Sequence, residues 1–281
     1  MLGSHVPSVG GVSKAIDRAI AIGCTAMQIF VKNNMQWFAK PFSGEEVSAF
    51  TEHPLRDRLG AVVAHAGYLI NLAAEGSENH EKSLRSLADE MLRCEQLGIR
   101  SLVLHPGSHL GKGQDHGIAC VARSLDLLHA GHPGLKVRIA LEITAGQGSC
   151  LGADFGDIAR IMDACATPER LEVCFDTAHA FAAGHDLSAP GGAEKVFAEF
   201  DRMIGLRRLS VLHINESKAA LGSHVDRHDN LGAGKIGLET FRWIMNEPTL
   251  SAIPKILETP KGKDLAEDVE AMRLLRSFLP R

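Results

Sequence analysis

Two polar residues at the end of an apolar run raise the first chemical question in this sequence. In CFDTAHAFAAGHD (174–186), the run from Leu171 to Phe175 stops at Asp176, and His179 follows three residues later. A buried carboxylate or imidazole costs free energy unless something pairs with it. We therefore expect both side chains to have a partner that the local sequence does not supply.

Short β-type runs alternate with longer amphipathic segments along the chain. The expected strands are 2–5, 26–30, 61–65, 101–105, 137–142, 171–176, 208–213 and 254–258. The expected helices are 12–22, 44–58, 78–97, 115–129, 155–165, 191–204, 238–246 and 264–278. Eight such units in 281 residues predict an α/β protein, a (β/α)8 TIM barrel forming a single domain over 1–281. An open doubly wound sheet is the competitor, but GSHVPSVGG after the first strand is not its GxGxxG fingerprint.

Seven of the eight expected strands end in a histidine or an acidic residue, and only the second strand, ending near Phe30, breaks this pattern. The seven residues are His5, His65, His105, Glu142, Asp176, His213 and Glu258. The C-terminal ends of barrel strands meet on one face, where the catalytic loops lie. We therefore expect these side chains, far apart in the sequence, to converge at the mouth of the barrel.

Imidazole nitrogens and carboxylate oxygens without cysteine favour a catalytic site for zinc, manganese or iron. The loops add His179 and the pair Asp226 and His228, whose spacing of two directs both side chains to one side of an extended backbone. The nine candidate metal ligands are His65, His105, Glu142, Asp176, His179, His213, Asp226, His228 and Glu258. One zinc ion binds only three or four protein ligands, so we expect two or three ions. Clustered ions suit phosphoryl chemistry.

The other histidines are assigned by position. We leave His5 out of the ligand set. His5, His109 and His185 are candidates for side chains that support the ligands, and His224 also lies near the mouth. The histidines that we expect on the solvated surface are His53, His80, His116, His129 and His132.

The composition is that of an ordinary globular protein, with 45% hydrophobic and 23% charged residues. The six scattered cysteines form no CxxC pair, which indicates reduced thiols. The sequence shows no secretory signal and no apolar run long enough for a membrane helix, so we expect a cytoplasmic protein with no membrane partner. The formal charge of −4 argues mildly against a nucleic-acid partner.

Six long motifs resemble the endonuclease IV family of zinc-dependent apurinic/apyrimidinic (AP) endonucleases, which share the barrel fold expected above. They are HAGYLINLA (65–73), HPGSHL (105–110), TAGQGSCLG (144–152), FDTAHAFAAGHDL (175–187), HINESKAALGSHVDRH (213–228) and VDRHDNLGAGKIG (225–237). Their order and length cover almost the whole chain, from Gly3 to Glu258 and beyond.

The resemblance implies a cluster of three zinc ions, with Mn²⁺ as a substitute in one site. His65, His105 and Glu142 would hold the first zinc, and Glu142 would also bridge to the second. Asp176, His213 and Glu258 would complete the second site, and His179, Asp226 and His228 would form the third. The catalytic role implied for Glu142 is to bridge the ions and orient the attacking hydroxide.

The activity implied by the resemblance is hydrolysis of the phosphodiester 5′ to an abasic site in double-stranded DNA, leaving a 3′-hydroxyl and a 5′-deoxyribose phosphate. Duplexes with blocked 3′ ends are a related substrate, and the family suggests a monomer. Four ligand carboxylates contribute a charge of −4 and three Zn²⁺ would contribute +6, so the site would change from −4 to +2. The acidic composition is therefore compatible with DNA.

Contacts to DNA are also implied. Tyr68 and Leu69 match the family's wedge residues, while Met35 stands where the family usually has an inserting arginine. The basic candidates for phosphate contacts are Lys32, Lys218 and Arg227, together with Lys112 and Lys235. Two further departures from the family are Ile143, in place of asparagine, and His185, in place of tyrosine.

Two other functions stay open on the sequence. A metal-dependent sugar isomerase or epimerase of the same barrel class would also present histidines and carboxylates, but through a smaller set. The group of His179, Asp226 and His228 and the Tyr68–Leu69 wedge argue against it. A damage-binding protein that has lost catalysis is the second alternative, which the intact ligands disfavour and Ile143 keeps open.

Overall fold

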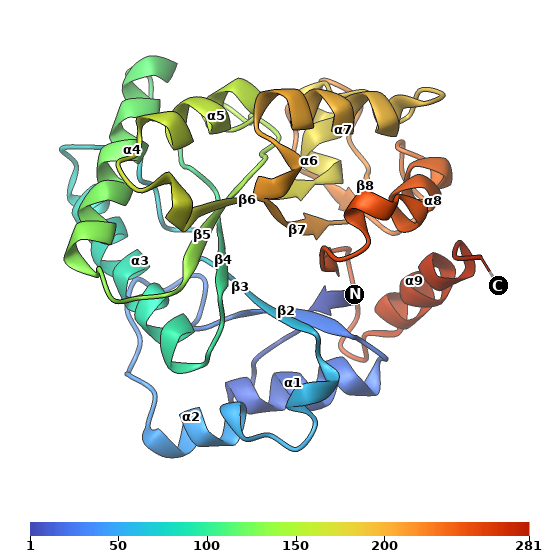
Figure 1. The fold of residues 1–281 in the computed structure, drawn as a ribbon, viewed down its shortest axis with the longest axis horizontal. Helices are drawn as coiled ribbons and strands as arrows, with labels where there is room; N and C mark the ends of the chain where they lie inside the picture. Colours follow the sequence, from blue (N-terminus) through green and yellow to red (C-terminus); the bar gives the residue numbers. More distant parts are fainter. Residues whose placement is uncertain (281) are drawn as a thin grey trace.

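The computed structural model describes residues 1–280, and Figure 1 shows its strands at the centre with helices around them. Eight parallel strands form a closed barrel in the order β1-β10-β7-β6-β5-β4-β3-β2. These strands are β1 (Leu2–His5), β2 (Ala26–Phe30), β3 (Ala61–His65), β4 (Ser101–Leu104), β5 (Arg138–Glu142), β6 (Leu171–Asp176), β7 (Leu209–His213) and β10 (Lys255–Leu257). The predicted (β/α)8 barrel is confirmed.

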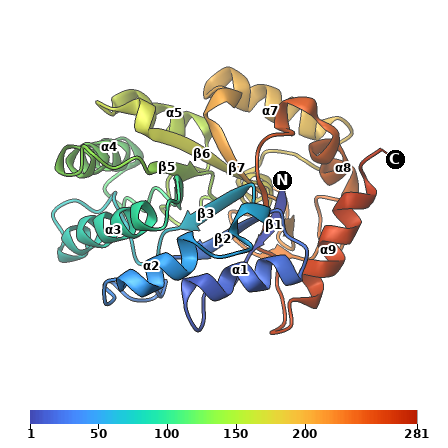
Figure 2. The ribbon, with the colours of Figure 1, turned by 60° about the horizontal axis from the view of Figure 1, so that its bottom comes forward.

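The helices surround the strands. Figure 2 shows α1 to α5 and α7 to α9 following one another around the barrel, while α6 is buried beside β6. They are α1 (Val12–Ala21), α2 (Gly44–Thr51), α3 (Glu78–Gln96), α4 (Gln114–Gly131), α5 (Phe155–Ala164), α6 (Thr177–Ala183), α7 (Gly192–Met203), α8 (Leu238–Asn246) and α9 (Ala266–Ser277). Helix α9 contacts β1, so the last helix lies beside the first strand.

The structure departs from the expected elements in three places. Helix α2 ends at Thr51 instead of 58, because Pro54 lacks a backbone N–H and restricts the residue before it; a short 3₁₀ turn, Arg56–Arg58, follows. Helix α6 follows β6 directly and was not predicted. The loop after β7 contains a small antiparallel pair, β8 (Glu216–Ser217) and β9 (His228–Asp229).

Two apolar regions stabilise the fold. The larger lies between the strands and the helices, where Leu87, Met91 and Cys94 of α3 are buried. The smaller, which we call the apolar layer, fills the inside of the barrel. Its members are Ala26, Val63, Val103, Ala140, Cys174, Val211 and Ile256. Because the inside is filled, the barrel is a packed scaffold for its mouth and not a channel.

Within residues 1–280, no helix combines the length and the apolar composition that crossing a membrane would require. The six cysteines all lie in this described part and are unpaired, as expected for reduced thiols.

Candidate metal centre

A second layer of side chains, which we call the polar layer, follows the apolar layer toward the C-terminal ends of the strands. Its members are Gln28, His65, His105, Glu142, Asp176, His213 and Glu258. Each stands two residues after a member of the apolar layer, and side chains two apart on a strand point the same way. The geometry of the strands therefore brings these groups together inside the mouth.

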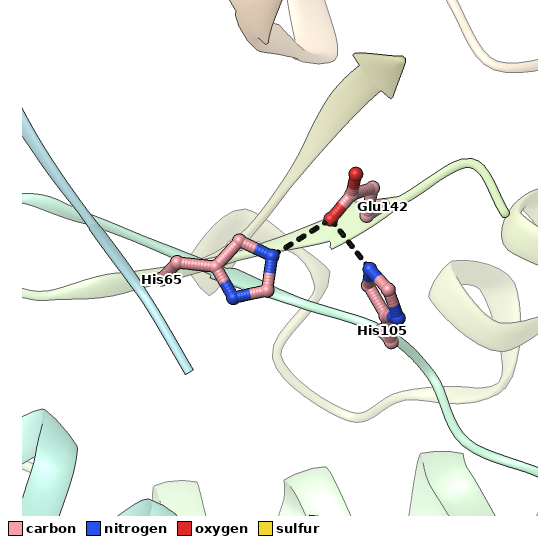
Figure 3. A group of neighbouring side chains, drawn as sticks. All are labelled: His65, His105 and Glu142. Carbon is pink, nitrogen blue, oxygen red and sulfur yellow. Dashed lines mark hydrogen bonds and ion pairs between the residues drawn. The ribbon is translucent and has the colours of Figure 1, made fainter. Parts of the chain in front are cut away.

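Glu142 is the centre of a first group, drawn in Figure 3. Its Oε2 lies 3.1 Å from His65 Nε2 and 3.0 Å from His105 Nε2. Glu142 and His65 are buried, while the His105 side chain is 35% exposed. This group is therefore open to solvent on the His105 side.

The other oxygen of Glu142 joins a second, deeper group. Glu142 Oε1 lies 3.0 Å from His213 Nδ1, which is also 3.1 Å from Glu258 Oε2 and 3.6 Å from Asp176 Oδ2. Glu142, Asp176 and His213 are fully buried. Three carboxylates thus surround one imidazole nitrogen, and Glu142 is common to both groups.

The third group combines α6 with the loop that leads to β9. Asp176 caps α6 by accepting a hydrogen bond from the backbone N–H of His179, so the first turn of the helix turns His179 back toward the mouth. His179 Nε2 lies 3.3 Å from Asp226 Oδ2, and His228 Nε2 lies 3.4 Å from Asp226 Oδ1. Pairing of β9 with β8 fixes His228 in this position.

Four of the histidines share one hydrogen-bonding arrangement, in which one ring nitrogen contacts a carbonyl oxygen and the other faces the carboxylates. The pairs are His65 Nδ1 with Ala66 O (2.7 Å), His179 Nδ1 with Ile143 O (3.0 Å), His228 Nδ1 with Glu258 O (3.3 Å) and His213 Nε2 with Gln28 Oε1 (2.8 Å). A carbonyl only accepts, so each of these nitrogens carries the hydrogen. In the neutral imidazole the second nitrogen then has a lone pair directed at the cluster, as in metal-binding histidines.

The charges in the cluster depend on one another. Burial alone would raise the pKa of Glu142, but His105 and His213 hold it well below its usual value. Burial alone would lower the pKa of His179, but Asp176, Asp226 and Glu142 raise it well above its usual value. The carboxylates are thus ionised and need nearby positive charge, which protonated imidazoles or bound cations can supply.

The donor set fits divalent transition ions. Nitrogen and oxygen atoms lie within 4.8 Å of one another in three groups: His65, His105 and Glu142; Glu142, Asp176, His213 and Glu258; and Asp176, His179 and His228. Asp226 adjoins the last group through its contacts with His179 and His228. His228 Nε2 is a buried atom without a hydrogen-bond partner in residues 1–280, as expected of a nitrogen that binds a cation. Cys174 adjoins His213, but burial raises the pKa of its thiol to about 12, so it stays a neutral neighbour.

Gln28 and Asn215 are site residues that the sequence analysis missed. The Gln28 amide donates to Glu258 Oε1 at 2.6 Å and accepts from His213. The Asn215 amide donates to Asp176 Oδ2 at 2.6 Å and accepts from the backbone of Glu258. Both side chains are buried and orient carboxylates of the deeper group. The alternation of side chains along a strand could have revealed Gln28, because it stands two residues after Ala26 and so faces the inside of the barrel as well.

Two cavities lie beside the cluster. One, of about 430 Å³, is lined by His105, His179 and Asp226; the other, of about 390 Å³, by Tyr68, His228 and Glu258. A cavity of about 580 Å³ opens at the opposite end of the barrel, near Arg100 and Arg170, far from these groups. We assign the first two to the site because they contain its side chains.

Comparison with known proteins identifies the family. Residues 16–278 match the xylose isomerase-like TIM barrel family. The chain is 48% identical over 277 residues to the "Probable endonuclease 4" of Chloroflexus aurantiacus, covering 99% of this chain and 97% of that protein. The chain belongs to the endonuclease IV family. The protein of the same name from Geobacter sulfurreducens is 44% identical over 280 residues, covering 100% of this chain and 95% of that one. This member of the endonuclease IV family is therefore a hydrolase of the nuclease class.

Solved structures agree with this assignment. Endonuclease IV from Thermus thermophilus superposes with a TM-score of 0.85 at 36% identity, covering 99% of this chain and 98% of that chain. A D-tagatose 3-epimerase-like protein reaches a TM-score of 0.72 at 18% identity, covering 98% and 96%. The second likeness shows the shared fold alone.

The predicted wedge residues of this endonuclease IV family member lie at the rim of the mouth. Met35 is 63% exposed and Tyr68 58% exposed, while Leu69 is half-buried. The Tyr68 ring lies 5.8 Å from the His65 ring, so it stands directly beside the first group. Lys218 and Arg227 are exposed and joined by a backbone hydrogen bond of 2.9 Å next to the β8–β9 pair. Lys218 and Arg227 therefore lie close to Asp226 and His228 along the chain and across the β8–β9 pair.

The prediction for Lys32 as a phosphate contact is wrong. Its side chain is 2% exposed, and Nζ lies 2.5 Å from Glu90 Oε1 inside the protein. An ammonium group without a charged partner in the interior would be very costly, so the pair with Glu90 holds it there. Lys112 and Lys235 are exposed, as predicted.

The supporting histidines differ in what they touch. His5 Nδ1 lies 3.3 Å from Glu258 Oε1, so it contacts a candidate ligand. His185 instead stacks on Phe155, with ring centroids 4.0 Å apart, and its Nε2 donates to a backbone carbonyl. His109 accepts from the N–H of Gly113 in its own loop.

Two histidines expected on the surface are buried. His80 Nε2 lies 2.8 Å from Ser124 Oγ, and His129 Nδ1 lies 2.6 Å from Thr167 Oγ1. Each faces a hydroxyl on a neighbouring segment, which the sequence alone does not place beside it.

A separate cluster, Glu75, His116 and Cys120, also has the residue types of a metal site. The guanidinium group of Arg123 already forms an ion pair with Glu75 and contacts Cys120. Its positive charge occupies the place that a cation would need, so we assign no metal to this cluster.

Proposed function

We propose that the protein is a DNA-repair endonuclease that hydrolyses the phosphodiester 5′ to an abasic site in duplex DNA. It leaves a 3′-hydroxyl and a 5′-deoxyribose phosphate. The observation that carries this proposal is the shared arrangement of His65, His179, His213 and His228, each with one nitrogen held by a carbonyl and the other aimed at carboxylates. The family name of the relatives supports the reaction class.

Three zinc ions are proposed for the cluster. His65, His105 and Glu142 would hold one, and Glu142 with Asp176, His213 and Glu258 a second. His179, Asp226 and His228 would hold a third, since Asp226 contacts both imidazoles. When bound, the ions would supply Lewis-acid charge and lower the pKa of water.

The protein's own residues would hold the DNA around this cluster. Lys218 and Arg227 would bind phosphates and position the duplex without reading its sequence. Tyr68 and Met35 would enter the base stack and stabilise the distortion that exposes the abasic sugar. Gln28 would keep His213 in the tautomer that leaves Nδ1 facing the carboxylates.

Incision of a defined duplex tests the function. The substrate carries one tetrahydrofuran abasic analogue, which hydrolases can cut but which cannot undergo β-elimination, and the undamaged duplex is the control. We expect a single nick 5′ to the analogue whose 3′ end a polymerase extends. Binding without a nick by the zinc-loaded protein would instead identify a damage-binding protein, and neither binding nor a nick would reject the proposal.

A further inference from the structure

A buried ion pair joins two loops at the mouth. Lys32, at the start of the loop between β2 and α2, contacts Glu90 of α3, and their side chains are 2% and 1% exposed. Lys32 Nζ also donates to Ser86 Oγ and to the carbonyl of Gln36, both at 3.0 Å. One ammonium group therefore ties both ends of the 32–36 segment to helix α3.

Glu90 extends this junction to the next loop, between β3 and α3. Both of its carboxylate oxygens accept from the N–H of Gly67, at 3.2 and 3.1 Å. A side chain at position 67 would meet Asn34 O at 3.1 Å and Glu90 Oε1 at 3.3 Å, so the loops are closely packed here. The N–H of Tyr68 donates to Asn34 O at 3.2 Å.

The exposed ends of this junction are Met35 and Tyr68. Met35 directly follows Asn34, whose carbonyl accepts from the Tyr68 N–H, and Tyr68 directly follows Gly67. The backbone N–H of Met35 also donates to Asn33 Oδ1. The backbone on which each exposed side chain stands is therefore held by the junction. The two side chains are 63% and 58% exposed. A buried charge pair is weak evidence for stability, because apolar side chains of similar volume often stabilise a protein as well or better. What the Lys32–Glu90 pair provides beyond stability is a fixed position for the backbone groups that it binds.

We propose that Lys32 and Glu90 are a positioning pair that makes the Met35 loop and the Tyr68 loop one rigid unit, which enters duplex DNA at a fixed spacing. Neither residue touches DNA; both act through the two exposed side chains. This inference rests on the proposed function, because the unit is needed only where the base stack must be opened.

The double variant Lys32→Met/Glu90→Leu tests the pair, since it replaces the charges by apolar side chains of similar size. We expect unchanged zinc content and a rise in KM of about 10-fold on a paired abasic duplex, with kcat within about 2-fold, because small misplacements at such sites have large effects. A duplex whose abasic site lies in a mismatched bubble is already unstacked. On that substrate we expect KM to return to within about 2-fold of wild type.

Arg93→Met is the matched control. Arg93 lies one turn further along α3, is buried, pairs with Asp89 and donates to the carbonyls of Ala39 and Lys40 in the same loop, at 2.9 Å each. Arg93 contacts a part of that loop beyond Met35. Any change in the KM of the Arg93→Met variant should therefore be equal on paired and bubble substrates. The proposal would be overturned if the KM of the double variant also changed equally on both substrates. It would likewise be overturned if the double variant kept the wild-type KM on both.

Hydrogen exchange separates this proposal from the function itself. In the single variant Glu90→Gln, and in the double variant if it folds, the amides of Gly67 and Tyr68 should lose protection together. Unchanged protection in both variants would show that the loops are not joined by this pair. If the wild-type protein fails to nick abasic DNA, the proposed function is rejected, while the exchange result still decides whether the two loops form one unit.

Discussion

The apolar layer and the polar layer are two neighbouring regions of one barrel interior with opposite chemistry. Both are built by the same strands and both are largely buried. Ala140 and Glu142 on β5, or Val211 and His213 on β7, differ only by a step of two residues. The backbone treats the two layers alike, so the difference between them comes from side chains alone.

The contrast shows which layer needs something from outside the chain. Val211 and its neighbours fill the barrel and satisfy one another by packing. Glu142 and Asp176 are fully buried and Glu258 is 15% exposed, so their negative charges gather where little water reaches them. This costs free energy unless positive charge offsets it. We therefore assign folding to the apolar layer and cation binding to the polar layer.

The largest expected effect is on Glu142→Gln, which keeps the shape of the polar layer and removes the charge at its centre. We expect incision of the abasic duplex to fall by at least about 100-fold, because even the outer partners of metal ligands change activity by 10–100-fold. Full activity in steady-state assays would show that Glu142 does not bridge the two groups.

Val211→Ala is the matching change in the apolar layer. Truncating this fully buried side chain should lower the free energy of unfolding by about 1–3 kcal/mol while zinc content and kcat stay at wild-type values. Chemical denaturation and elemental analysis measure the two quantities. Loss of zinc in this variant would remove the distinction between the layers.

Metal removal tests the need for positive charge directly. A ligand that binds only the folded state stabilises it by about 4 kcal/mol when present at about 1,000 times its dissociation constant. Stripping zinc should therefore lower the melting temperature, and Zn²⁺ should restore it. Mg²⁺ should fail to do so because it prefers oxygen ligands to imidazole. An unchanged melting temperature after complete stripping would contradict cation binding in the polar layer.

Gln28→Leu makes one position of the polar layer apolar. The variant loses the partner of His213 Nε2 and the donor to Glu258, so we expect zinc affinity to fall by roughly 10–100-fold. Gln28→Glu is the control for the tautomer, since its carboxylate still accepts from His213 Nε2. Competition with a chelator of known affinity measures the zinc affinity of both variants. If both bind zinc as tightly as the wild type, the role of Gln28 is limited to packing.

The last prediction leaves the polar layer and concerns the stability contribution of Lys255, which stands one residue before Ile256 of the apolar layer. Its ammonium donates to the carbonyls of Leu250 and Ile253, and burial lowers the pKa to about 8. Because the unfolded chain binds this proton more tightly, folding is penalised at neutral pH and the penalty fades as pH rises above 8. Wild type should therefore gain roughly 1–3 kcal/mol relative to Lys255→Met between pH 7 and 10. Denaturant unfolding of both proteins measures this difference. An equal difference in free energy of unfolding between wild type and Lys255→Met at pH 7 and at pH 10 would contradict the prediction.

Most of the barrel could be predicted from sequence because its strands are short apolar runs bounded by turns. The predicted 26–30 and 61–65 are β2 and β3 as observed. Helix α6 was missed because it has only seven residues and its N-cap, Asp176, is also the last residue of the strand β6. Its cap is also a site residue, so local structure and site chemistry overlap there.

The convergence of Glu142 with His65, His105 and His213 followed from barrel geometry. Gln28 was missed because we examined strand ends, whereas it lies in the middle of β2. Lys32 was wrongly placed at the surface because its partner, Glu90, is on a distant helix. Contacts between residues so far apart in the chain depend on tertiary packing, which a single sequence does not display.

Elemental analysis of purified protein, dialysed without chelator, tests cation binding in the polar layer most directly. We expect about three zinc ions per chain in the wild type and fewer in Glu142→Gln, with Val211→Ala equal to wild type. A wild-type protein that holds no transition metal, yet keeps its fold and nicks abasic DNA, would contradict the assignment.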